Sequence, residues 1–310
     1  MKIAISIGDL NGVGIEIALK AHEEIKTWCK PTYMISQTML EQAADLLKLP
    51  IPDDFHTSEV GTAFTITPSQ ATKESGQYSY DSFLKAIELA KTNQANAITT
   101  LPINKEAWNK AGIIYKGHTD ALADIFQKEA IMMIGCQKLF VALFTHHIPL
   151  KDVAPQISLK ALETFMIDLY HEIKEEKIGV LGLNPHAGDG GVLGDEEEII
   201  TQAIKNVNRH LLEDIFIGPL VPDTAFTPHM REHIHYFVCM YHDQGLIPAK
   251  TLYFDEGINV SLNLLIIRTS VDHGTAYDKA YKNQKLSQQS YLNAIKEAIR
   301  LAQKKLNYKI

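Results

Sequence analysis

The chain has 310 residues, 45% of them hydrophobic, which is enough to bury a large core in one domain or in two lobes. Its formal net charge of -7, with no basic stripe, argues against nucleic acid as the main partner. The sequence has no apolar run long enough to predict a membrane span. Its three cysteines are widely spaced and form no C-x-x-C motif, which favours a cytoplasmic protein with reduced thiols.

Strands and helices are predicted to alternate along the chain. The first strand covers residues 2–7, with no signal peptide before it, and a helical stripe follows from residue 15. A helix is predicted around residues 83–90, a short strand at 97–100, a two-residue alternation at 258–263, a buried strand at 264–267 and a last helix around 292–302. This alternation predicts an α/β fold with a mostly parallel sheet.

The first strand is followed by three glycines, Gly8, Gly12 and Gly14. Their spacing does not match G-x-G-x-x-G, and no P-loop lysine follows them. A tight turn into a helix explains the glycines better than contact with a nucleotide, although Asp9 could still face a ligand.

Three apolar strands lead into histidines. Residues 139–144 run into His146 and His147, residues 177–183 into His186, and residues 236–240 into His242. Ligands of α/β proteins bind at the carboxyl ends of strands, so His147, His186 and His242 are candidate metal ligands. A structural, hydrogen-bonded role is the alternative for each, because none shows the short spacing of a zinc finger or of H-E-x-x-H.

Seven motifs in fixed order resemble the 4-hydroxythreonine-4-phosphate dehydrogenase (PdxA) family over roughly residues 3–302. They are Gly8-Asp9 with Gly12-x-Gly14-x-Glu16, residues 101–105 (LPINK), 117–120 (GHTD), 184–188 (NPHAG), 222–224 (PDT), 241–245 (YHDQG) and 272–276 (DHGTA). The resemblance implies an isocitrate/isopropylmalate dehydrogenase-like fold, with two lobes around a central cleft. It implies a single such unit, with lobes of approximately 1–110 plus 255–310 and 111–254, working as a homodimer with a shared active site.

The same resemblance assigns roles to individual residues. The metal ligands are His147, His186 and His242, and the substrate contacts are His118, Thr119, Lys250, Asn259 and Arg268. Asp223 and Asp243 fall where the family keeps acids beside the metal, and we take both, with Lys250, as catalytic. The turn His273-Gly274-Thr275 matches the dinucleotide side of the fold.

The activity implied is oxidation of 4-phosphooxy-L-threonine to 2-amino-3-oxo-4-phosphooxybutanoate, which decarboxylates to 3-amino-2-oxopropyl phosphate in pyridoxal phosphate biosynthesis. NAD is the expected cofactor, with NADP as the alternative, beside one divalent ion. Three imidazoles favour Zn²⁺ or Co²⁺ over Mg²⁺. Other readings of the same residues are a metal-dependent hydrolase of a phosphorylated metabolite, a dehydrogenase of a related phosphorylated hydroxy acid, or a silent metabolite-binding protein.

Two positions depart from the family pattern. Leu10 stands where the family usually has proline, and residues 277–283 replace a glycine-containing stretch. The second departure predicts that NAD binds with altered adenosine contacts.

Overall fold

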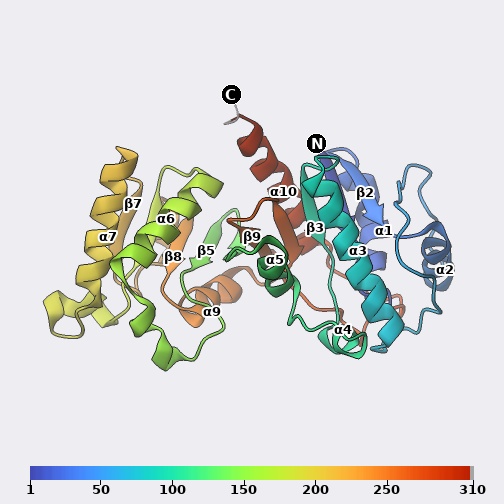
Figure 1. The fold of residues 1–310 in the computed structure, drawn as a ribbon, viewed down its shortest axis with the longest axis horizontal. Helices are drawn as coiled ribbons and strands as arrows, with labels where there is room; N and C mark the ends of the chain where they lie inside the picture. Colours follow the sequence, from blue (N-terminus) through green and yellow to red (C-terminus); the bar gives the residue numbers. More distant parts are fainter. Residues whose placement is uncertain (308–310) are drawn as a thin grey trace. The chain divides into compact units, whose positions relative to one another are not determined.

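The computed structural model describes residues 1–307 as an α/β protein whose chain forms two compact units (Figure 1). Unit 1 contains Met1–Ala130 together with the C-terminal segment from Ile258, and unit 2 contains Ile131–Gly257. Among residues 1–307, no helix has both the length and the apolar character needed to cross a lipid bilayer.

Unit 1 is built on five strands in the order β2-β1-β3-β10-β9, of which only β9 runs antiparallel to its neighbour. Its elements are β1 (Lys2–Ser6), α1 (Gly14–Ile25), β2 (Lys30–Met34), α2 (Gln37–Leu47), α3 (Lys73–Lys91), β3 (Ala97–Thr100), α4 (Lys105–Lys110), α5 (His118–Phe126), β9 (Ile258–Leu262), β10 (Arg268–Val271) and α10 (Gln289–Asn307).

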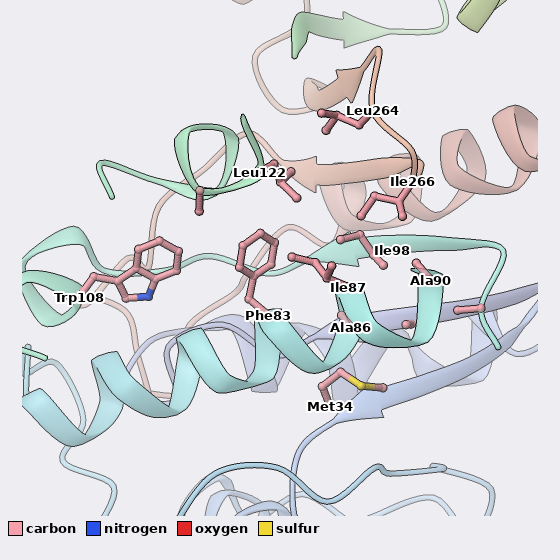
Figure 2. Close-up of a cluster of buried hydrophobic side chains, with 13 residues drawn as sticks. Met34, Phe83, Ala86, Ile87, Ala90, Ile98, Trp108, Leu122, Leu264 and Ile266 are labelled. Carbon is pink, nitrogen blue, oxygen red and sulfur yellow. The ribbon is translucent and has the colours of Figure 1, made fainter. Parts of the chain in front are cut away.

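Helices cover both faces of this sheet. On one face Phe83 of α3, Ile98 of β3 and Trp108 of α4 belong to one buried apolar cluster (Figure 2). On the other face the Thr269 hydroxyl donates a hydrogen bond to the Ala294 carbonyl oxygen of α10, at 2.9 Å. Successive residues of a strand point to opposite faces, so the short, fully buried strand β3 supplies side chains to both layers.

Unit 2 has five strands in the order β4-β5-β8-β6-β7, and only β4 is antiparallel. Its elements are β4 (Ile131–Cys136), β5 (Leu139–Leu143), the 3-10 turns η1 (Leu150–Asp152) and η2 (Ala154–Gln156), α6 (Leu159–Ile173), β6 (Ile178–Leu181), η3 (Pro185–Gly191), α7 (Glu196–Leu211), β7 (Phe216–Leu220), α8 (Pro228–Arg231), β8 (Tyr236–Cys239) and α9 (His242–Tyr253). Four parallel neighbours, β5, β8, β6 and β7, therefore end at one edge of the sheet.

The predicted α/β class with a mostly parallel sheet is confirmed. The predicted strand at residues 264–267 is wrong, because the strand there is β10, beginning at Arg268. Residues 263–267 connect the antiparallel strands β9 and β10, starting from a left-handed Asn263 with φ of 61°. Leu264 and Ile266 pack into the unit 1 core from this connection while Leu265 is 74% exposed, so their apolar run does not mark a strand.

Candidate functional site

The carboxyl edge of the unit 2 sheet gathers four of the predicted residues. His147 follows β5, His242 begins α9 directly after β8, His186 lies in η3 after β6, and Asp223 follows β7. The strand order β5-β8-β6-β7 makes these strand ends neighbours although they are far apart in sequence. His147, His186 and Asp223 are exposed and His242 is half-buried, so this edge is open to solvent.

Two polar side chains tie these strand ends together. The Thr145 hydroxyl donates to the Met240 carbonyl oxygen at 2.6 Å, which joins the end of β5 to the end of β8. The Gln244 side chain accepts from the Met240 amide at 2.7 Å and donates to the Gly182 carbonyl oxygen at 2.7 Å. Gln244 is buried and therefore fixes the start of α9 against the segment that leads to His186.

The segment carrying His186 has a left-handed backbone. His186, Ala187 and Gly188 have φ of 53°, 51° and 77°, a region that only glycine occupies without cost. Glu197 in the first turn of α7 stabilises this conformation, because its carboxylate accepts from the Asn184 amide at 2.7 Å and from the Asn184 side chain at 2.9 Å. Strained non-glycine backbone of this kind concentrates at functional sites.

The imidazole rings of His147 and His242 lie together, with centroids 5.7 Å apart. His242 donates from Nδ1 to Asp243 Oδ1 at 2.7 Å, which leaves Nε2 as its nitrogen for a metal ion. A carboxylate on the second nitrogen is the usual support of a metal-bound histidine, so the donor chemistry fits a transition ion.

The potential ligand atoms of His147, His186 and His242 do not all lie within 4.8 Å of one another. Among residues 1–307, the groups whose potential ligand atoms all lie within 4.8 Å of one another are His229–Glu232–His233 and His22–Glu23–Asp54. The ligand atoms of His147, His186 and His242 would therefore have to come closer together to hold one ion.

Helix α9 carries two further predicted residues beside His242. Asp243 is 70% exposed at its side chain in the first turn, and Lys250 is half-buried in the last turn. In unit 1, Thr119 lies half-buried in the first turn of α5 and has no hydrogen bond to Arg268 among the described residues.

Unit 1 contains a buried guanidinium that has no acidic partner among the residues that the structure describes. Arg268 is 3% exposed, and its hydrogen bonds within residues 1–307 go to the Thr100 hydroxyl at 2.8 Å, the Ser261 hydroxyl at 3.1 Å and His118 Nδ1 at 3.2 Å. We call these four residues the Arg268 cluster. Burial lowers the pKa of Arg268 to about 9, which reflects a positive charge that no carboxylate offsets.

The imidazole of His118, next to Arg268, carries a buried hydrogen-bond donor. Burial, and then the charge of Arg268, hold the pKa of His118 well below its ordinary value, so the ring is neutral. Since a guanidinium only donates, His118 Nδ1 accepts and Nε2 carries the proton. That Nε2 is buried without a partner among residues 1–307, as is Asn259 Oδ1, and the rings of Phe83 and Trp108 lie edge-on to His118 at 4.6 and 5.5 Å.

Register places these polar groups on one face of the unit 1 sheet. Arg268 pairs with Ser261 and Ser270 with Asn259 across the β10–β9 ladder, and Ser270 also pairs with Thr100 of β3. Residues opposite each other in a ladder share a face, so Asn259 lies on the same face as Arg268. A buried guanidinium, one buried donor without a partner (His118 Nε2) and one buried acceptor without a partner (Asn259 Oδ1), all among residues 1–307, indicate a binding site for an anionic, polar ligand.

The predicted dinucleotide turn packs on the glycine turn after β1. The Val13 amide donates to the Thr275 carbonyl oxygen at 3.0 Å, and a Cβ on Gly12 would lie 2.8 Å from that oxygen. Gly8 has φ of +70°, and a Cβ there would lie 2.2 Å from the Pro102 carbonyl oxygen. These glycines allow close backbone packing, whereas Gly274 is exposed and a Cβ there would meet nothing within 4 Å.

The segment that departs from the family pattern is bonded to the same turn. Tyr277 donates to Asp9 Oδ2 at 2.7 Å, and Tyr281 donates to the Leu10 carbonyl oxygen at 2.6 Å. Burial raises the pKa of Asp9, while Tyr277, the Asn11 amide and Ser75 oppose that rise by hydrogen bonding. The tyrosines thus hold residues 277–281 against the Asp9 turn.

Five supporting residues had no role assigned from the sequence, although Asn184 and Gln244 stand within the family motifs: Thr100, Ser261, Asn184, Glu197 and Gln244. Gln244 had a visible signal, because it directly follows His242 and Asp243. Thr100 bonds to Arg268, 168 residues away, so its role depends on strand pairing. Ser261 lies 7 residues from Arg268, and Asn184 lies 13 residues from Glu197, but no sequence pattern marked either pair.

Comparisons with known proteins agree on one family. Residues 27–298 match the family model described as "Pyridoxal phosphate biosynthetic protein PdxA". A relative from Sulfurimonas denitrificans named 4-hydroxythreonine-4-phosphate dehydrogenase is 60% identical, with 98% of this chain and 99% of the relative covered. A second of that name, from Campylobacter fetus subsp. fetus, is 54% identical over 97% and 98%.

Solved structures are also similar to this chain over nearly its whole length. The crystal structure of a 4-hydroxythreonine-4-phosphate dehydrogenase from Burkholderia phymatum matches with a TM-score of 0.82 and 32% identity, covering 97% of this chain and 98% of that one. A terephthalate 1,2-cis-dihydrodiol dehydrogenase from Burkholderia xenovorans matches with a TM-score of 0.71 at 24% identity, covering 96% and 97%. The second likeness shows a shared fold.

Proposed function

This chain belongs to the family of the pyridoxal phosphate biosynthetic protein PdxA, and on that premise we propose that it is an NAD-dependent, divalent-metal-dependent 4-hydroxythreonine-4-phosphate dehydrogenase. The product would be 2-amino-3-oxo-4-phosphooxybutanoate, which decarboxylates to 3-amino-2-oxopropyl phosphate. NADP is the alternative dinucleotide. The relatives' printed names support the dehydrogenase and its pathway.

The observation that carries the proposal is the Arg268 cluster. A buried guanidinium whose partners are two hydroxyls and a neutral imidazole needs an anion to offset its charge. A phosphorylated amino acid supplies that charge, and the Nη1 N–H of Arg268 that these bonds leave over would donate to an anionic oxygen. His118 Nε2 would be a further donor for the ligand, and Thr119 would add a hydroxyl from the first turn of α5.

Asn259 adds selectivity to this site. Its Oδ1 is a buried acceptor without a partner among the described residues, so it suits a substrate that also carries a donor, such as an ammonium or a hydroxyl. A substrate lacking that donor would leave the oxygen unpaired, which costs binding free energy. 4-Phosphooxy-L-threonine carries anionic and donor groups together, as do related phosphorylated hydroxy acids with an amino group.

The unit 2 edge would hold the metal ion through His147, His186 and His242. A bound divalent ion stabilises an alkoxide and the ketone formed from it. The imidazole donors favour Zn²⁺ or Co²⁺ over Mg²⁺. Asp243 keeps the His242 ring oriented by accepting from Nδ1, and Lys250 adds a positive charge on the same helix. We assign Asp243, Asp223 and Lys250 to catalysis as candidate proton carriers or charge partners.

The dinucleotide would bind at His273-Gly274-Thr275. This turn is fixed by the Val13–Thr275 hydrogen bond, and Gly274 leaves its outer side open. We also propose that the working protein is a cytoplasmic homodimer whose active site takes residues from both chains, as the family resemblance implies.

The direct test is NADH formation, followed by absorbance, with 4-phosphooxy-L-threonine as substrate. We expect NADH to form with this substrate, and we expect no NADH formation once the metal has been removed by a chelator. Release of inorganic phosphate without NAD would instead identify a hydrolase. NADH formation only with other phosphorylated hydroxy acids would keep the reaction class and change the substrate.

The metal ligands are tested separately by elemental analysis. His186→Ala should bind one ion fewer than wild type, whereas His210→Ala, which removes an exposed histidine of α7, should bind the same number. Equal metal content in wild type and His186→Ala would remove His186 from the ligand set.

A further inference from the structure

A second group of potential metal ligands lies on the surface of unit 2, at the turn formed by α8. The potential ligand atoms of His229, Glu232 and His233 all lie within 4.8 Å of one another, and the two imidazole rings are 5.2 Å apart. Spacing of three and four residues places side chains on one face of a helical turn. All three side chains belong to exposed residues, so an ion from solution can reach them.

The backbone of this turn is held in place. Pro228 begins α8, and the turn continues past the helix through hydrogen bonds from the Glu232 amide to Pro228 at 3.1 Å and from the His233 amide to Met230 at 3.1 Å. Arg231 anchors it to the rest of unit 2, donating to the Phe226 carbonyl oxygen at 2.9 Å and to the Tyr253 hydroxyl at 2.6 Å. The ligand-bearing face therefore has a fixed scaffold.

In the second group of close potential ligands, His22, Glu23 and Asp54, a lysine ammonium already lies where a cation would bind. There the Lys26 ammonium lies 2.9 Å from Glu23 and 3.2 Å from Asp54, in the place of a cation. Both nitrogens of His22 are already used, by the Tyr33 hydroxyl and by Asp54. Within residues 1–307, His229, Glu232 and His233 have no such ion pair or hydrogen bond at their ligand atoms.

We propose that His229, Glu232 and His233 form a surface site for a divalent transition ion of the Zn²⁺ class, separate from the site at His147, His186 and His242. Two imidazoles and one carboxylate match the ligand preferences of Zn²⁺, whereas Mg²⁺ and Ca²⁺ prefer oxygen ligands. Water fills the remaining coordination positions, because the turn faces solvent. The full chain then binds one more zinc ion than the dehydrogenase site alone requires.

The test is equilibrium dialysis of the full chain against Zn²⁺, in wild type and in His229→Ala/His233→Ala. The double variant should bind one zinc ion fewer, with its thermal unfolding and any dehydrogenase activity unchanged, because both residues are exposed and lie outside the catalytic set. The matched control is His171→Ala/His210→Ala, which removes two exposed histidines of α6 and α7 and should bind as wild type does. Equal zinc binding by wild type and the His229→Ala/His233→Ala protein would overturn the proposal.

A second pair of measurements separates this site from the proposed enzyme site. In the His186→Ala background, the His229→Ala/His233→Ala change should remove a further zinc ion, whether or not the protein oxidises the phosphorylated substrate. Arg231→Ala keeps all three ligands but loses their anchor, so zinc affinity at this site should fall by about tenfold, as for other supporting contacts. Unchanged affinity in Arg231→Ala together with unchanged stoichiometry in the double variant would show that the turn binds no ion.

Discussion

At the scale of single residues, Arg268 gives the sharpest prediction. Arg268→Ala removes the guanidinium that the proposed anionic substrate would contact, so kcat/KM should fall by the equivalent of about 1.5–3 kcal/mol, the range for a charge-assisted hydrogen bond. Arg268→Lys keeps the charge but loses the planar fork, so it should recover only part of the loss. Arg209→Ala, an exposed change in α7, is the control. Steady-state kinetics showing no loss in Arg268→Ala would remove Arg268 from the substrate site.

Gly274 tests the placement of the dinucleotide. A side chain there would enter open space, since a Cβ atom at this position would meet nothing within 4 Å, so Gly274→Val should leave unfolding and metal content unaltered. It should raise KM for NAD if the dinucleotide lies against this turn. Gly274→Ala, with a smaller side chain, should raise it less. Wild-type NAD kinetics in both variants would place the dinucleotide elsewhere.

At the scale of elements, η3 shows why two similar glycines should differ. Gly188 and Gly190 both have left-handed φ, of +77° and +65°, so alanine at either should cost about 1–2 kcal/mol. A Cβ on Gly188 would also lie 2.7 Å from Glu197 Oε2 and 2.8 Å from the Gly194 carbonyl oxygen, whereas Gly190 is open. Urea unfolding should therefore show a larger loss of stability in Gly188→Ala than in Gly190→Ala.

Metal affinity is a second measurement that should distinguish Gly188→Ala from Gly190→Ala. Because Glu197 holds the segment that carries His186, Gly188→Ala should also reduce metal affinity at the His147, His186 and His242 site, while Gly190→Ala should largely preserve it. Equal stability and equal metal affinity in the two variants would show that the Glu197 contact does not position η3.

The elements that sequence reasoning found and missed differ in where their determinants lie. The strands before His147, His186 and His242 were visible because each is a short buried apolar run. In the Arg268 cluster, the family resemblance pointed to Arg268 and His118. Thr100 and Ser261 were missed, since their contacts with Arg268 depend on β10 pairing with β3 and β9, which no local pattern encodes. Residues 264–267 were wrongly predicted to form a strand. A connection that packs into the unit 1 core is apolar just as a buried strand is, so the apolar run does not distinguish the two.

At the scale of the whole molecule, the two units divide the proposed site residues between them. The metal ligands and Lys250 belong to unit 2, whereas Arg268, His118, Thr119, Asn259 and the dinucleotide turn belong to unit 1. Within unit 2, His186 and His242 follow neighbouring strands of one chain, which Gln244 ties together. Because of this division, the proposal of an active site shared between the two chains of a homodimer can be tested by mixing two inactive variants.

If each active site takes its metal ligands from one chain and its anion-binding residues from the other, mixing His186→Ala with Arg268→Ala subunits should restore activity. A randomly mixed twofold dimer would recover about a quarter of the wild-type activity, because half of the dimers are mixed and each has one intact site. Mixing His186→Ala with His242→Ala should restore nothing, since both ligands come from the same chain and every site lacks one of them. Kinetics after subunit exchange, with sedimentation to verify the dimer, check both outcomes. Recovery in the second mixture, or none in the first despite proven exchange, would contradict this division of the site.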